Sequence, residues 1–202
     1  YTKMANKDAP FGFIPVRMLG GAYFSGGQDE FDILSTYGTN IFSGDVVELE
    51  TDGTIKIGAP GTGDRNLIGV FNGCFYTDSN GKPTYSRYWP ASTTSTDAKA
   101  FIISDPNVIF EAQEDNTEIG STATHPAQIG QNADFVSTHA GTTAAGRSKQ
   151  ELDSDTIHAT NTLNFRIVGK STDPENSDAT SANCNWYCRL NEHHYTLNVD
   201  GV

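Results

Sequence analysis

The feature of this sequence that most limits its fold is an alternation of apolar and polar residues in two short segments on either side of an Asp-Gly pair. Residues 45–50 alternate with a period of two, and residues 55–57 resume the alternation. Successive side chains of a strand point to opposite faces, so this period suits a strand with one buried face. Asp52 and Gly53 lie between the two segments and tolerate the positive φ of a tight turn. The pattern predicts a β-hairpin.

Two later stretches predict further hairpins. Residues 78–81 read Asp-Ser-Asn-Gly and lead into a return strand at 84–89, which Pro90 ends. Near the end of the chain, residues 163–168 and 184–190 alternate on either side of a polar loop. In the second of these segments every other residue is Cys, Trp or Leu, which is typical of a strand half-buried in a sandwich or barrel.

The composition extends this prediction to the whole chain. Twenty glycines and many threonines and aromatic residues suit short strands joined by tight turns, and they suit long helices poorly. We therefore expect an all-β fold, a β-barrel or β-sandwich of short antiparallel strands with long loops and an extended N-terminal arm. The arm would span residues 1–19 and a single β domain residues 20–202, with a loop-rich insertion at about 114–160, where apolar residues are scarce.

The arm carries an apolar run that is a candidate contact surface. Residues 11–19 are largely apolar, but Pro15 interrupts them, so they form either an edge strand or an extended arm. Such a run packs back on its own domain or lies on a neighbouring subunit. For the second alternative the contact residues would be Phe11, Phe13, Ile14 and Val16.

The charge of the chain excludes one class of partner. It carries 25 acidic and 13 basic residues, a formal net charge of −12, and no segment is rich in Lys or Arg. Nucleic-acid binding depends on clustered basic residues, so we expect no nucleic-acid partner. The acidic surface either keeps the protein soluble by repulsion or docks on a basic partner lattice, and charge alone does not separate these alternatives.

The length of the apolar runs and the number of cysteines bear on membrane association and on the compartment in which the protein is made. No apolar run approaches the roughly 18–20 residues of a membrane span, so we expect no membrane partner. Three cysteines, an odd and sparse number, fit a protein made in a reducing cytoplasm rather than a disulfide scaffold.

Candidate chemistry is weak throughout. Cys184 and Cys188, with His193 and His194 nearby, have a spacing loosely compatible with zinc, but residues four apart on a strand lie about 13 Å from each other. We interpret both cysteines as small buried hydrophobic residues. The chain contains no Gly-x-Ser-x-Gly elbow and no His-Glu-x-x-His pattern. We therefore predict no catalytic residues, no metal ligands and no cofactor: a protein that is not an enzyme, with a hydrolase hidden from sequence motifs as the less favoured alternative.

Aromatic residues offer one more candidate. Tyr85, Tyr88 and Trp89 fall in the return strand of the second predicted hairpin. Rows of aromatic side chains on a sheet can stack against sugars, but cross-strand pairs in a core or a subunit interface have the same sequence pattern. We favour core or interface and keep a glycan-binding surface as the alternative.

Several phrases together resemble small structural proteins of the virions of tailed bacteriophages, especially marine ones. They are residues 4–17, 41–49, 68–73, 85–90, 146–148 and 189–193. Within them, Ser43-Gly-Asp-Val-Val, Asp52-Gly-Thr-Ile-Lys and Ile68-Gly-Val-Phe are similar to the barrel segment of head-decoration (cement) proteins. The chain departs from the smallest of these proteins by its extra length around 114–160.

This resemblance implies a function and a place of action. Head-decoration proteins bind the outer capsid surface, commonly as trimers, and brace subunits of the major capsid protein against internal pressure. The resemblance therefore implies a homo-oligomer, with a trimer favoured, that is made in the host bacterial cytoplasm and joins the virion. It carries over no catalytic residues. The alternative function is a host-adsorption or glycan-binding module on the phage head or tail.

Overall fold

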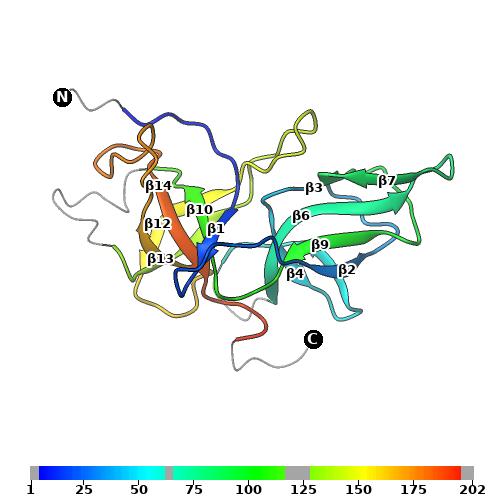
Figure 1. Ribbon diagram of the computed structural model, residues 1–202, viewed down its shortest axis with the longest axis horizontal. Coiled ribbons are helices and arrows are strands. Elements are labelled where there is room, and N and C mark those ends of the chain that lie inside the picture. The colour runs from blue at the N-terminus through cyan, green and yellow to red at the C-terminus, as the bar shows by residue number, and fades with distance from the viewer. Residues whose placement is uncertain (1–4, 62–65, 117–127, 197–202) are drawn as a thin grey trace.

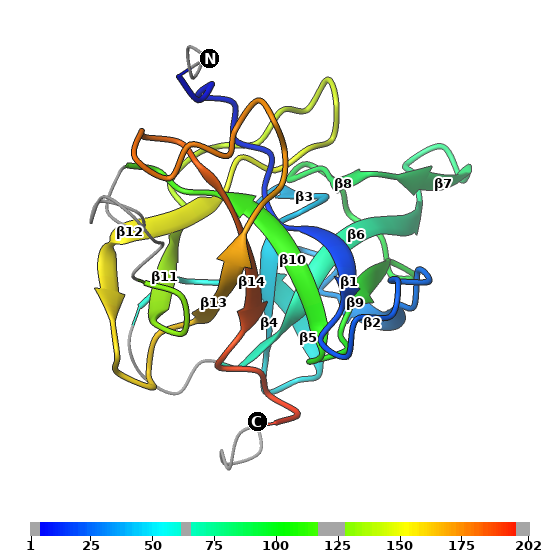
Figure 2. The ribbon, with the colours of Figure 1, turned by 60° about the vertical axis from the view of Figure 1, so that its left-hand side comes forward.

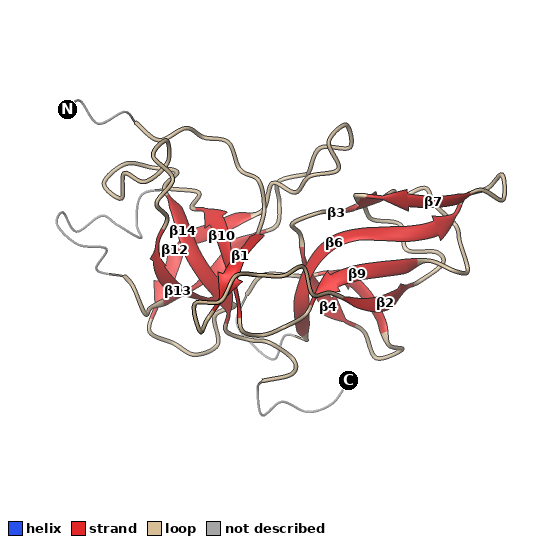
Figure 3. Cartoon of the chain, in the orientation of Figure 1, coloured by secondary structure: helices blue, strands red, loops and turns tan. Residues whose placement is uncertain are grey.

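The computed structural model describes residues 5–61, 66–116 and 128–196. These residues form strands and loops without a helix (Figure 3). The strands gather into two lobes (Figure 1): a first lobe built from strands within residues 29–103, and a second built from residues 14–18 and strands within 108–190. The all-β prediction is confirmed.

The first lobe is a closed barrel. Its strands pair in the order β4-β5-β2-β9-β6, and β6 pairs again with β4. All of these pairings are antiparallel except that of β2 with β5. The barrel strands are β2 (Asp29–Ile33), β4 (Val46–Leu49), β5 (Thr54–Ile57), β6 (Leu67–Thr77) and β9 (Lys99–Ile103). The long strand β6 extends beyond the barrel and pairs with β7 (Pro83–Ser86), and β3 (Ile41–Phe42) pairs with β8 (Tyr88–Trp89).

The second lobe is a six-stranded antiparallel sheet with the strand order β1-β10-β14-β13-β11-β12. Its strands are β1 (Ile14–Met18), β10 (Val108–Gln113), β11 (Asn132–Val136), β12 (Glu151–His158), β13 (Phe165–Lys170) and β14 (Asn185–Leu190). Its first strand comes from the start of the chain and the others from the second half, so the chain enters this lobe, builds the barrel and returns (Figure 2).

The buried apolar side chains of the described residues form two clusters, one inside the barrel and one between the lobes. The barrel interior contains Ile33, Ile41, Val47, Ile55, Ile68, Phe71, Cys74, Trp89, Ala98, Ala100 and Ile102. The second cluster lies between the six-stranded sheet and the outside of the barrel. From the barrel it takes Val46, Leu67, Val70 and Ile103, together with Phe13, Val108, Phe110, Ala112, Ala133, Phe135, Leu152, Phe165, Ile167, Cys184, Trp186, Cys188 and Leu190. Barrel strands therefore bury side chains on both faces, inward and toward the sheet.

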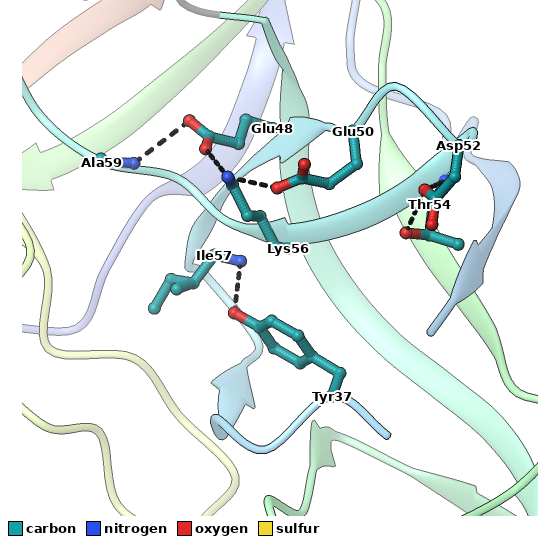
Figure 4. A network of polar contacts seen from close by, with 8 residues as sticks. All are labelled: Tyr37, Glu48, Glu50, Asp52, Thr54, Lys56, Ile57 and Ala59. Carbon is teal, nitrogen blue, oxygen red and sulfur yellow. Dashed lines mark hydrogen bonds and ion pairs between the residues drawn. The ribbon is translucent and has the colours of Figure 1, made fainter. Parts of the chain in front are cut away.

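The hairpin predicted around Asp52 is confirmed. Strands β4 and β5 pair antiparallel, and Gly53 has φ +82°, a conformation open to glycine at little cost. The Asp52 carboxylate accepts hydrogen bonds from the backbone N–H of Thr54 (2.9 Å) and from its hydroxyl (2.7 Å), which holds the turn (Figure 4). Beside the hairpin the Lys56 ammonium contacts Glu48, whose side chain is 11% exposed, and the more exposed Glu50.

The two other predicted hairpins are also present. β6 and β7 pair across the turn at 78–81, and β13 and β14 pair as the closing hairpin. Alternation in the last strand segment places four side chains on the core face, each at most 2% exposed: Cys184, Trp186, Cys188 and Leu190.

The apolar run near the N-terminus is an edge strand of the second lobe. β1 pairs only with β10 in this sheet, and Pro15 lies on this edge, where its missing N–H is tolerated. Of the two alternatives drawn from the sequence, the structure shows the one that packs on its own chain.

The stretch at 114–160 contains more regular structure than its composition predicts. β11 and β12 both lie in it and pair with each other, and the loop between them includes Thr142 and Arg147, which form a short bridge. This loop reaches the barrel, where Ser148 N–H donates to the carbonyl oxygen of Ser43 (2.9 Å). Residues 117–127, part of the predicted insertion, lie outside the described residues.

Candidate functional site

The four residues predicted to contact a capsid lie on different faces of the N-terminal segment. Phe13 is 1% exposed in the core, whereas the adjacent Ile14 is 38% exposed. Phe11 and Val16 are half-buried. A continuous contact surface made from these four side chains would require Phe13 to leave the core. The structure brings together Phe13 with Phe135 and Phe165 instead.

Polar contacts fix the residues before Phe13 as well. The side-chain amide of Asn6 donates to three backbone carbonyls of the 178–182 loop, at 2.8, 3.0 and 2.9 Å. Its amide oxygen accepts a hydrogen bond from Asp178 N–H. The Gln113 side chain accepts from Ala9 N–H and donates to the Lys7 carbonyl. Hydrogen bonds between side chains and backbone thus join the extended segment and the second lobe in both directions: Asn6 bonds the backbone of the loop, and Gln113 bonds the backbone of the segment.

The aromatic candidates separate into core and surface. Trp89 is fully buried in the barrel, and its indole N–H donates to the Tyr37 carbonyl oxygen (3.0 Å). Tyr88 is half-buried and stacks on Phe42, with 5.5 Å between ring centroids. Tyr85 is 77% exposed. The three side chains therefore do not form one exposed row, and Tyr85 is the one of the three that is largely exposed.

Tyr85 belongs to a different aromatic group on the outside of the barrel sheet. Its ring lies 5.0 Å from Phe75 on β6 and 6.3 Å from Phe101 on β9, and the planes of Tyr85 and Phe101 are within 10° of parallel. Phe75 is the direct cross-strand partner of Tyr85, and Phe101 pairs with Gly73 in the next row. These three strands therefore present one aromatic surface.

Sequence reasoning did not single out Phe101, although a signal was available. Ala100 and Ile102 fill the barrel interior, so the alternation of this strand turns Phe101 to the opposite face. An apolar residue on the polar side of an alternating strand marks an exposed patch. The strand pairing that brings it beside Tyr85 was not readable from the sequence.

Polar side chains surround the three rings. Glu30 on β2 is exposed and pairs directly with Phe101, and Asp32 pairs with Lys99. The Lys99 ammonium contacts the Asp32 carboxylate at 2.5 Å. At the bulge of β6, the Asn72 side-chain amide donates to the Gln28 side-chain oxygen (2.9 Å). We call Glu30, Phe75, Tyr85 and Phe101 the aromatic–acidic face.

A second feature is an open cleft of about 1090 Å³ beside the N-terminal segment. His139 Nδ1 lies 2.8 Å from a carboxylate oxygen of Glu151, whose side chain is 4% exposed. Burial raises the pKa of Glu151, and the neighbouring imidazole opposes this rise. Arg147, Lys149 and Asp115 also line the cleft, so charges of both signs meet there. The pair ties the 137–147 loop to β12, which is a structural use of both groups.

The cysteine and histidine residues near the end of the chain are not gathered into a cluster that could hold a metal ion. Cys74, Cys184 and Cys188 are buried free thiols, and burial raises the pKa of Cys74 to about 12. Within residues 5–61, 66–116 and 128–196, no group of three His, Cys, Asp or Glu side chains is placed to hold an ion.

His193 is buried next to a barrel strand rather than exposed as a ligand. Its Nδ1 accepts a hydrogen bond from Tyr195 N–H (3.1 Å), so the neutral ring carries its proton on Nε2. Burial lowers the pKa of His193 from 6.5 to about 4, and the nearby Ser104 carbonyl only partly opposes this shift. Charging this ring therefore costs stability.

This shift predicts a dependence of stability on pH. The folded-state pKa lies below the unfolded value, so the stabilisation is complete above pH 6.5 and is lost as the pH falls toward 4. Its size is about 3 kcal/mol. His193→Asn keeps an acceptor near the Nδ1 position, and the variant should lose about 3 kcal/mol less than the native chain between pH 7 and pH 4 in urea unfolding. Equal losses in both proteins would contradict a buried neutral His193.

Comparisons with protein-family models, curated proteins and solved structures found no match to this chain. In the part of the chain that the structure describes, no helix is long and apolar enough to cross a membrane.

Proposed function

We propose that this chain is a non-enzymatic structural protein that decorates the outer surface of a phage capsid and stabilises it by binding across subunits of the major capsid protein. One observation carries the proposal. The three phrases that resemble head-decoration proteins, at residues 43–47, 52–56 and 68–71, contribute to three consecutive strands, β4, β5 and β6, of a closed barrel. The sequence resemblance and the barrel geometry therefore coincide on the same residues.

The surface of the chain supports binding rather than turnover. The net charge of −12 favours a basic partner, and the exposed aromatic–acidic face supplies a local contact surface. A decoration protein binds as many copies, and assembly into trimers would let several modest contacts act together on one capsid. Formation in the host cytoplasm and incorporation into the virion belong to the same proposal.

Cryo-electron microscopy of intact virions, with copy number from quantitative mass spectrometry, tests it. We expect hundreds of copies over the head, each contacting several capsid subunits. A few copies at a vertex or on the tail would contradict a cement role and favour adsorption to the host. Absence from the particle would place the protein's work elsewhere in the infected cell.

Glycan binding is the second candidate, and one observation favours it. Tyr85 presents a largely exposed ring with Asn72 and Gln28 close to the same sheet surface. The pyranose faces of sugars stack on such rings, and amide side chains hydrogen-bond their hydroxyl groups. Because Trp89 and Tyr88 are packed within the fold, the surface available for this function is smaller than the sequence predicts.

A further inference from the structure

We propose that the aromatic–acidic face is the docking surface of this protein, and that it binds an arginine or lysine side chain projecting from a basic protein surface. This inference deepens the proposed function and rests on it for the identity of the partner as the capsid lattice. The proposed contact surface lies on the outside of the barrel sheet and not on the N-terminal segment, where the sequence placed it.

The rings are held in place before any partner arrives. Gly73 lies directly opposite Phe101, so no side chain fills the position between Phe101 and β7. Tyr85 leans across this gap and stacks on Phe101, while Phe75 supports its other side. A Cβ at Gly73 would lie 3.0 Å from the Ser86 carbonyl oxygen, which shows how closely β7 packs there. A preorganised surface loses little side-chain entropy on binding.

One ring of this face is largely open to solvent, and the other two, Phe75 and Phe101, are half-buried. Phe71 and Trp89 in the interior of the same lobe are fully buried. Tyr85 is 77% exposed although two other rings lie within stacking distance. Stacked rings that remain open to solvent on one face offer a partner a large apolar area, which is typical of contact residues at protein interfaces.

The charge beside the rings favours a cation. Glu30 is exposed next to Phe101, and Lys99, the cross-strand partner of Phe75, contacts the Asp32 carboxylate. The carboxylates of Glu30 and Asp32 thus share one ammonium group. A guanidinium or ammonium group placed over Phe101 would meet the negative face of the ring and the Glu30 carboxylate together. An apolar partner would bury Glu30 with only the Lys99 ammonium, which Asp32 already holds, as a counter-charge, and an anionic partner would be repelled. Charge complementarity therefore favours a basic partner.

Binding to undecorated heads of the virus that encodes the chain tests the inference. The full-length chain and its variants are titrated onto purified heads at low and at physiological salt. We expect Tyr85→Ala to weaken binding about tenfold or more, and Tyr85→Phe to retain it, because the ring and not the hydroxyl group forms the surface. Glu30→Gln should weaken binding about fivefold and reduce its salt dependence, because one charge pair is lost.

Two matched variants separate this face from general surface effects. Tyr23 is 92% exposed and Glu175 is exposed in a loop of the other lobe. Tyr23→Ala and Glu175→Gln should bind within twofold of the native chain. Thermal unfolding of all variants checks that each is folded, and Tyr85→Phe keeps the test informative if Tyr85→Ala is destabilised.

The outcomes distinguish the two proposals. If the native chain does not bind heads, the capsid function fails and the inference falls with it. If the native chain binds and Tyr85→Ala and Glu30→Gln bind equally well, the inference alone is wrong and the function stands. Binding of the native chain to an array of neutral hexose oligosaccharides, lost in Tyr85→Ala while head binding is unchanged, would also overturn it and assign the face to glycans.

Discussion

Gly69→Ala is expected to destabilise the protein by about 3 kcal/mol or more, through overpacking at the centre of the barrel. Gly69 lies in β6, pairs with Val47 on β4 and has φ +154°, a region that is costly for residues with a Cβ. An added Cβ would lie 2.9 Å from Ile102 Cγ2 and closer still to the Ile103 carbonyl oxygen. Because the second of these atoms belongs to the backbone, β6 and β9 would have to separate.

The measurement is the urea midpoint of unfolding, with Gly27→Ala as the matched control. Gly27 has no positive φ, and a Cβ there would meet no atom within 4 Å. The control should change stability by no more than about 0.5 kcal/mol. A Gly69→Ala midpoint equal to that of the control would show that the barrel does not close as described. If Gly69→Ala fails to fold at all while the control folds, the expected direction holds.

Phe13→Ala should cost about 4 kcal/mol, because it removes a buried ring that packs against rings of two other strands. Phe13 stacks on Phe165 with 4.2 Å between centroids and 5° between planes, and it meets Phe135 edge-on at 6.2 Å. Its N–H also donates to the Gly44 carbonyl of the barrel side (2.9 Å), which holds the chain where it enters β1. Loss of this ring opens a cavity between the lobes.

Ile14→Ala is the control on the neighbouring residue. At 38% exposure Ile14 contributes less buried area, and its truncation should cost about 1 kcal/mol or less. Calorimetry of both variants compares the two directly. Similar, small losses in both variants would mean that the N-terminal segment is an extended arm that does not pack into the core.

These expected costs change how the N-terminal segment can be tested. Removing residues 4–16 would delete Phe13 and half of β1 together with the polar contacts of Asn6. Such a deletion would unfold or loosen the second lobe, so a loss of capsid binding would not identify the arm as a contact surface. Point variants on the aromatic–acidic face avoid this difficulty because Tyr85 and Glu30 lie outside both cores.

Local patterns determined the strands and turns of this protein. The period-two alternation at 45–50 and 184–190, with Asp-Gly or Asn-Gly at two of the turns, depends on steric preferences within a few residues. These preferences are independent of the rest of the chain, so the hairpins and their buried faces could be predicted. The missing N–H of Pro15 limited its segment to an edge strand or an extended arm, and the structure shows the edge strand.

Only the tertiary structure decided which strands meet. Sequence alternation does not state partners, so it could not show that β1 pairs with β10, almost a hundred residues later, or that β2 and β5 run parallel in the barrel. The burial of Phe13 and Trp89 and the exposure of Tyr85 depend on those pairings, although all three are aromatic residues. Strand register brings Glu30, Phe101 and Tyr85 onto one face, and contacts so distant along the chain are set by packing rather than by local propensity.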